Sequence, residues 1–94
     1  MEWNELKKTI TSIDENEKKI IEFTADIVDS LIDRRKELNW SQKVLAEKVG
    51  MKQSAISRFE GGANIPKLDT IFKIAVALGL KPVFVPDEEN NQKD

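Results

Sequence analysis

The chain has 94 residues, a length that corresponds to a single domain. It contains no cysteine and no histidine, which excludes disulfides, most zinc sites and every nucleophile–base pair built on these residues. Asp, Glu, Lys and Ser remain, but none has a spacing typical of catalysis, so we expect neither an enzyme nor a bound metal or cofactor. No run approaches the roughly 20 apolar residues of a membrane-spanning helix, and the acidic start is unlike a secretory signal, so we expect a cytoplasmic protein.

The net charge of −2 is unevenly distributed along the chain. Residues 1–30 carry −4, residues 31–67 carry +4 and residues 68–94 carry −2. A basic middle between acidic ends is typical of a localised surface that binds phosphate groups. The alternative is scattered solvated charge, which is common in small proteins.

The spacing of apolar and capping residues predicts an all-α fold that begins with two helices. Residues 2–12 read as a short helix, from which Trp3 either packs over the core or marks an exposed partner site. The next helix is expected over about 15–38, with Asp14 and Glu17 as a capping-box-like pair. Thr24 is a candidate cap for a break near Phe23-Thr24. The apolar stripe of this helix consists of Ile20, Ile21, Ile27, Val28, Leu31, Ile32 and Leu38.

Three shorter helices are expected after it. Ser41 is predicted to cap a helix over 42–49 that ends at Gly50, and a third helix spans about 53–60. A last helix is expected over 68–78, and its inward face is predicted to consist of Leu68, Ile71, Phe72, Ala75 and Leu78. Residues 80–85 are expected to form a short strand. Pro82 lacks a backbone N–H, so this strand would lie at the edge of a sheet or have Pro82 at its start. Residues 86–94 are expected to be disordered.

Ala46, Gly50 and Ile56 have the spacing of two short helices that cross steeply. A small residue on the first helix, Ala46, lets the second helix come close. Gly50 permits the sharp reversal of the backbone between them, and Ile56 fills their shared core. These three residues therefore predict a helix-turn-helix unit.

The segment 45–60, which contains this unit, resembles the core of the Cro/CI-type (XRE-type) helix-turn-helix domains. Pro66 and residues 68–79 fit the last helices of that family, so the resemblance covers about residues 24–80. It implies a compact five-helix, lambda-repressor-like domain that binds operator DNA as a homodimer. The sequence departs from the family at Lys67, where a capping Ser or Thr is usual. It also departs at Gly61-Gly62-Ala63, which carries no basic side chain where one often contacts phosphate.

This resemblance divides the chain into three parts. Residues 1–22 would be an N-terminal helical extension, residues 23–80 the helix-turn-helix domain, and residues 81–94 a short strand followed by an acidic tail. A helix-turn-helix domain binds DNA without such additions, so we expect the two outer parts to contact another protein chain or a second copy of this one.

The hydrogen-bonding groups in the major groove of DNA suggest roles for the polar side chains of the helix-turn-helix unit. The helix over 53–60 would be the recognition helix, with base contacts from its outward residues Gln53, Ser54, Ser57 and Arg58. Phosphate contacts are expected from Gln42, Lys43, Lys52 and Asn64. The alternative for each is an ordinary solvated polar residue, which most surface lysines and asparagines are.

The layout outside the domain resembles DNA-binding antitoxins of the HigA and HipB kind, and Trp40-Ser41-Gln42 and Phe72-Lys73-Ile74 resemble HipB in particular. This implies a repressor of its own operon that also neutralises a toxin, with Val83, Phe84 and Val85 in the homodimer contact. Two alternatives stay open: a stand-alone or phage-type regulator, and a protein-binding toxin inhibitor with minor DNA binding. The inhibitor is favoured by an acidic stretch that is otherwise a solvated helix face, namely Asp14, Glu15, Glu17 and Glu22.

Overall fold

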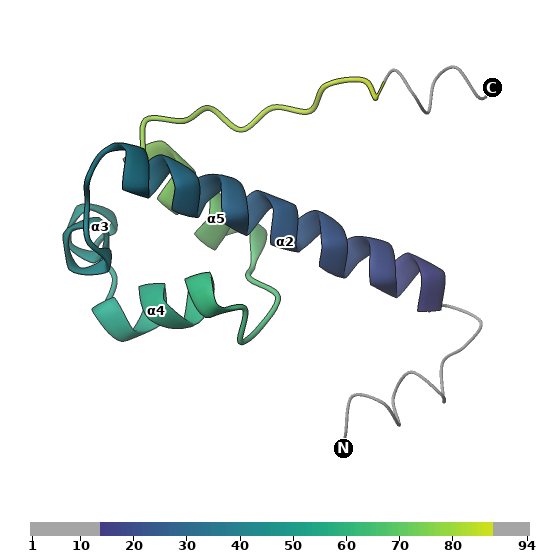
Figure 1. The fold of residues 1–94 in the computed structure, drawn as a ribbon, viewed down its shortest axis with the longest axis horizontal. Helices are drawn as coiled ribbons and strands as arrows, with labels where there is room; N and C mark the ends of the chain where they lie inside the picture. Colours follow the sequence, from purple (N-terminus) through teal and green to yellow (C-terminus); the bar gives the residue numbers. More distant parts are fainter. Residues whose placement is uncertain (1–13, 88–94) are drawn as a thin grey trace.

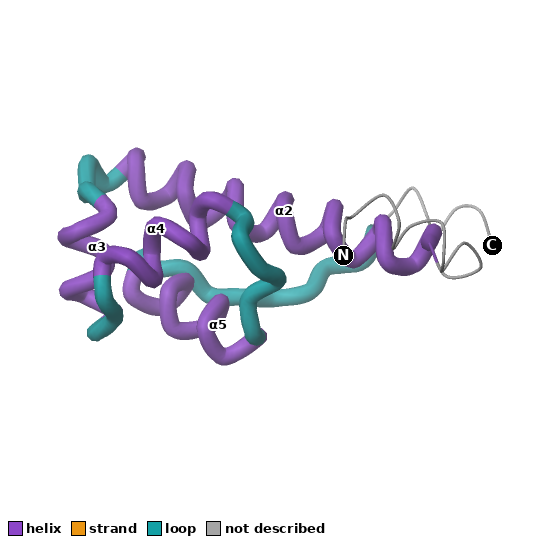
Figure 2. Tube along the Cα trace, turned by 90° about the horizontal axis from the view of Figure 1, so that it is seen from below, coloured by secondary structure: helices purple, strands orange, loops and turns teal. Residues whose placement is uncertain are grey.

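The computed structural model describes residues 14–87, which form four α-helices and no strand (Figure 1). These are α2 (Asp14–Glu37), α3 (Gln42–Val49), α4 (Gln53–Gly61) and α5 (Leu68–Ala77). The three short helices gather around the C-terminal half of α2, whose N-terminal half extends beyond them (Figures 1 and 2). None of these four helices is both long enough and apolar enough to cross a membrane.

The helix ends follow from local capping. The Ser41 hydroxyl accepts a hydrogen bond from the backbone N–H of Val44 at 3.1 Å, so α3 begins where the sequence predicts. α3 ends at Gly50, which adopts a left-handed conformation with φ of 82° that is strained for other residues. α5 begins directly after Lys67, whose side chain makes no capping hydrogen bond. The four predicted helix ranges are therefore confirmed to within one residue at each end.

Two expectations about the elements are wrong. α2 is continuous through Phe23 and Thr24, because the Thr24 hydroxyl donates to the Ile20 carbonyl at 2.7 Å within the helix and caps no new one. The described chain therefore contains four helices and not five. Residues 80–85 form no strand, since a strand needs a second one to pair with and residues 14–87 contain none. The helix expected over residues 2–12 lies outside the described residues.

All four helices contribute to one core, whose buried members are Val28, Leu31, Leu45, Ala46, Ile56, Phe59, Ile74, Ala75 and Leu78. The inward face predicted for α5 is partly wrong, because Leu68 is 78% exposed and Phe72 is 55% exposed. Ile74, which was not expected inside, is fully buried. At 3.6 residues per turn, the side of α5 that carries Ile74 and Leu78 faces the other helices, and Leu68 and Phe72 turn toward solvent.

Candidate nucleic-acid interface

The turn between α3 and α4 consists of Gly50, Met51 and Lys52. Ala46 and Ile56 lie in the helices on either side of it. The Ala46 carbonyl accepts hydrogen bonds from the backbone N–H groups of Gly50, at 2.8 Å, and Met51, at 2.9 Å. These two bonds close the end of α3 and direct the chain into α4. The Ala46 and Ile56 side chains are buried between the helices. The helix-turn-helix geometry predicted from the spacing is therefore present.

α4 has one buried side and one open side. Ile56 and Phe59 point into the core. The polar side chains on the other side, which are the predicted base contacts Gln53, Ser54, Ser57 and Arg58, are all exposed. A short helix with this division can enter a DNA major groove while its apolar side holds it on the domain.

The predicted phosphate contacts lie around this open side. Lys43 in the first turn of α3 and Lys52 directly before α4 are exposed. Asn64 and Arg58 both line a small cavity of about 180 Å³ between α4, the following loop and α5. A candidate phosphate contact and a candidate base contact are thereby brought together. Lys48, by contrast, lies over the Trp40 ring, with its Nζ 5.2 Å from the ring centre.

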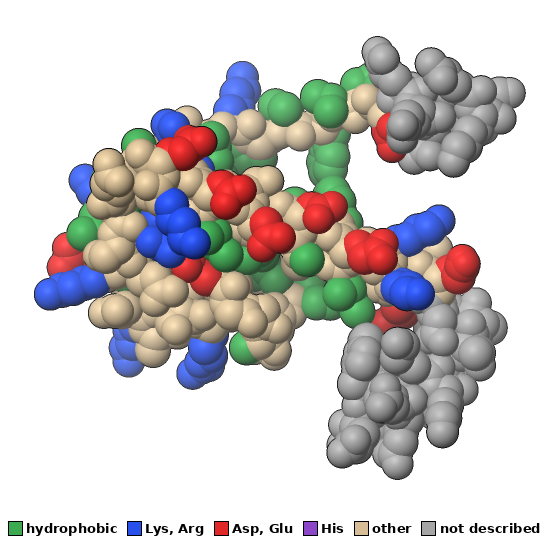
Figure 3. Space-filling model, viewed as in Figure 1, with side chains coloured by type: hydrophobic (Ala, Val, Ile, Leu, Met, Phe, Trp, Pro, Cys, Tyr) green, Lys and Arg blue, Asp and Glu red, His purple; other side chains and the backbone are tan. Residues whose placement is uncertain are grey.

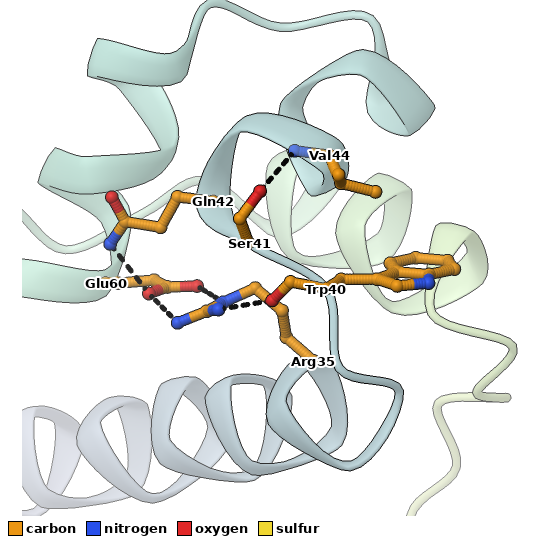
Figure 4. Close-up of polar contacts among 6 residues, drawn as sticks. All are labelled: Arg35, Trp40, Ser41, Gln42, Val44 and Glu60. Atoms are coloured by element: carbon orange, nitrogen blue, oxygen red, sulfur yellow. Dashed lines mark hydrogen bonds and ion pairs between the residues drawn. The ribbon is translucent and has the colours of Figure 1, made fainter.

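Gln42 differs from the other candidates because its side chain already has a partner. Its Nε2 donates to Oε1 of Glu60 at 3.0 Å (Figure 4). Glu60 also accepts two hydrogen bonds from Arg35, from Nε at 2.6 Å and from Nη2 at 3.0 Å. A third Arg35 nitrogen, Nη1, donates to the Trp40 carbonyl at 2.6 Å. These contacts tie α2, the turn before α3, the first residue of α3 and the end of α4 to one another.

The sequence does not identify Arg35 and Glu60 as a pair, although this pair ties α4 to α2. Their side chains are only 11% and 8% exposed, so the ion pair is largely buried. The sequence carried one signal: Arg35 follows Val28 and Leu31 at the spacing of the apolar stripe of α2, where a charged residue needs a buried partner.

One side of α2 carries an acidic row. Glu22, Asp26, Asp29, Asp33 and Glu37 are exposed and recur every three or four residues, so they form one acidic row along α2. Figure 3 shows this row, with Lys and Arg side chains projecting where α3 and α4 lie. Among the exposed cations, Arg58 lies on α4, Lys52 directly before it and Lys43 on α3.

The sequence matches the helix-turn-helix family over residues 31–85. It is 34% identical over 84 residues to an uncharacterized HTH-type transcriptional regulator of Haemophilus influenzae, which covers 89% of this chain and 84% of that protein. It is 38% identical over 60 residues to an uncharacterized HTH-type transcriptional regulator of Methanothermobacter thermautotrophicus, covering 61% of this chain and 87% of that protein.

Antitoxin HipB of Escherichia coli K12 is also similar. The two are 44% identical over 46 residues, which is 49% of this chain and 52% of HipB. No solved structure matches the chain. Because the family match spans more than half of the chain and includes the turn at Gly50 and all of α4, the protein belongs to the helix-turn-helix family.

Proposed function

We propose that the protein is a sequence-specific DNA-binding transcriptional repressor that acts as a homodimer. The observation that carries this proposal is the division of α4, whose buried Ile56 and Phe59 oppose four exposed polar side chains. The names of the relatives, which are HTH-type transcriptional regulators and an antitoxin, support the same function. A two-fold dimer would place two copies of α4 about one helical turn apart on the DNA.

Each polar residue has a role that fits its chemistry. Gln53 would make paired hydrogen bonds to adenine, and Arg58 would reach a guanine or a nearby phosphate. Ser54 and Ser57 would make shorter contacts to base edges. Lys43, Lys52 and Asn64 would contact the phosphate backbone. Gln42 would bind phosphate through its backbone N–H at the start of α3, because its side chain is held by Glu60.

Within this function, an autoregulatory antitoxin is the candidate that the similarity to HipB favours. The acidic row on α2 is a second supporting observation, since it offers a partner protein a surface separate from the basic end of the molecule. A toxin inhibitor with minor DNA binding would use the acidic stretch in the N-terminal half of α2, which consists of Asp14, Glu15, Glu17 and Glu22. A stand-alone or phage-type regulator would bind no toxin, and its acidic row would be a solvated helix face.

A gel-shift titration tests DNA binding, with the duplex upstream of the protein's own gene, a scrambled duplex and salt near physiological strength. We expect a saturable shift with the upstream duplex and none with the scrambled duplex. Gln53→Ala combined with Arg58→Ala should weaken the free energy of operator binding by roughly 2–6 kcal/mol in total, because each base contact contributes about 1–3 kcal/mol. Lys18→Ala combined with Lys19→Ala is the matched control, since both lysines are exposed on α2 away from α4.

Unchanged operator affinity in the Gln53→Ala, Arg58→Ala variant would show that α4 does not read the bases. The antitoxin role is tested separately by co-expression with the product of the neighbouring gene. Stable co-purification, together with relief of any growth arrest that the neighbour causes, would support it. A protein that binds its operator and ignores its neighbour would be a stand-alone regulator.

A further inference from the structure

An apolar groove lies between the N-terminal half of α2 and the loop that joins α4 to α5. Its volume is about 540 Å³, and its apolar walls are formed by Ile21, Ala25 and Val28 on one side and Phe59, Ile65 and Pro66 on the other. Ile65 remains 59% exposed at its rim. Apolar side chains show between α2 and this loop in Figure 3. The four candidate base contacts on α4 do not line the groove, whereas Asn64, a candidate phosphate contact, does.

The sequence before α2 has the pattern of a helix that needs such a groove. Its large apolar residues after Met1 are Trp3, Leu6, Ile10 and Ile13, at steps of three, four and three residues. On a helix these positions fall within an arc of about 80°, and polar residues occupy the rest of the surface. An isolated helix of this length is marginal in water, so it gains most of its stability by packing this stripe on another surface.

The position and the length of this segment match the groove. The described chain begins at Asp14, one helical turn before Glu17, which is the first residue of α2 to line the groove. The groove follows α2 from Glu17 to Asp29, which is roughly 18 Å at 1.5 Å per residue. A helix over residues 2–12 would be roughly 16 Å long. α2 begins at Asp14, and the acidic residues Glu15 and Glu17 lie in its first turn, where negative charge favours a helix start.

We propose that residues 2–12 fold back along α2 as an amphipathic helix and fill the groove with Trp3, Leu6 and Ile10 of the same chain. A tethered segment reaches the groove at a high effective concentration, which favours it over a separate molecule. Residues 2–12 carry two glutamates and two lysines and have no net charge, so the apolar stripe and not charge would hold the segment in the groove. The docked helix supports the loop that carries Asn64.

The absence of cysteine allows a direct test with a spin label on the full chain. A nitroxide is attached to Ala63→Cys, an exposed position that lines the groove, and the broadening of backbone amide signals is measured by NMR without DNA. We expect strong broadening of residues 3–11. The control label is placed at Lys43→Cys, which is exposed on α3 outside the groove and should leave those signals sharp.

Leu6→Asp combined with Ile10→Asp should abolish the broadening, while Lys8→Asp combined with Ser12→Asp, on the polar side of the same segment, should retain it. A mixture of isotope-labelled chains without nitroxide and unlabelled chains with nitroxide reveals contacts between molecules. Broadening in that mixture would overturn the proposal in favour of a second copy. Absence of broadening, or broadening that survives Leu6→Asp with Ile10→Asp, would also overturn it. None of these outcomes depends on DNA binding.

Discussion

Glu60 accepts hydrogen bonds from two different elements and so ties α4 to both of them. Its carboxylate takes two bonds from Arg35 on α2 and one from Gln42 at the start of α3. Within the described chain, no buried side-chain nitrogen or oxygen lacks a partner. The cluster is therefore fully satisfied as it stands, and a change in any member leaves another one short of a bond.

Glu60→Gln should lower the free energy of unfolding by about 3–5 kcal/mol, because it leaves the buried Arg35 guanidinium without a counter-charge. Urea denaturation followed by circular dichroism measures this. Glu37→Gln is the matched control: Glu37 pairs with Arg34 at 3.4 Å but is 68% exposed, so its loss should cost less than about 1 kcal/mol. Equal effects of the two changes would show that the Arg35–Glu60 pair is no more important than a surface ion pair.

At the scale of the element, α5 begins without the side chain that usually caps a helix. Lys67 occupies the N-cap position with extended backbone angles (φ −73°, ψ 154°) that suit Ser. Lys67→Ser should therefore stabilise the domain by about 1 kcal/mol, because the serine hydroxyl would accept a hydrogen bond from a backbone N–H in the first turn of α5. Thermal melting should show a rise in Tm of roughly 4–8 °C for a chain of this size. Lys67→Ala removes the same lysine without adding a cap, so a similar rise in that variant would refute the explanation.

The elements that the sequence predicts well are those whose causes are local. Ser41 and Gly50 define α3 through hydrogen bonds to residues three or four positions away. The open side of α4 follows from the same short-range periodicity. Arg35 and Glu60 are 25 positions apart, and their pairing depends on how the helices pack. The inward side of α5 depends on its neighbours in the same way, which is why Leu68 and Phe72 were misplaced.

At the scale of the whole molecule, the chain carries a net charge of −2 yet concentrates its basic residues in the middle of the sequence. The acidic row on α2 and the open side of α4 belong to different elements, so an approaching phosphate backbone is repelled by one and attracted by the other. This arrangement favours a docking orientation with α4 toward the DNA, even though the molecule as a whole is acidic.

The chain after α5 leaves an apolar run in solvent. Val83, Phe84 and Val85 are all exposed, with Phe84 90% exposed. Consecutive large apolar side chains in this state are typical of an interaction site. The homodimer proposed above would bury them against a second copy, and each buried Phe would contribute about 1.5–3 kcal/mol.

Phe84→Asp should therefore raise the Kd of the homodimer on the order of 100-fold or more, because the contact is lost twice in a two-fold dimer. Sedimentation equilibrium measures this, with Lys81→Ser as a control that also lowers the net charge by one unit, at another exposed position before the apolar run. Phe84→Asp should also lower the affinity for a duplex with two half-sites, while the affinity of one subunit for a single half-site stays unchanged. A dimer as stable as the wild type would contradict the assignment of Val83, Phe84 and Val85. Equal losses on both duplexes would instead place Phe84 in the folding of the subunit, because a monomer that is intact still presents α4 to one half-site.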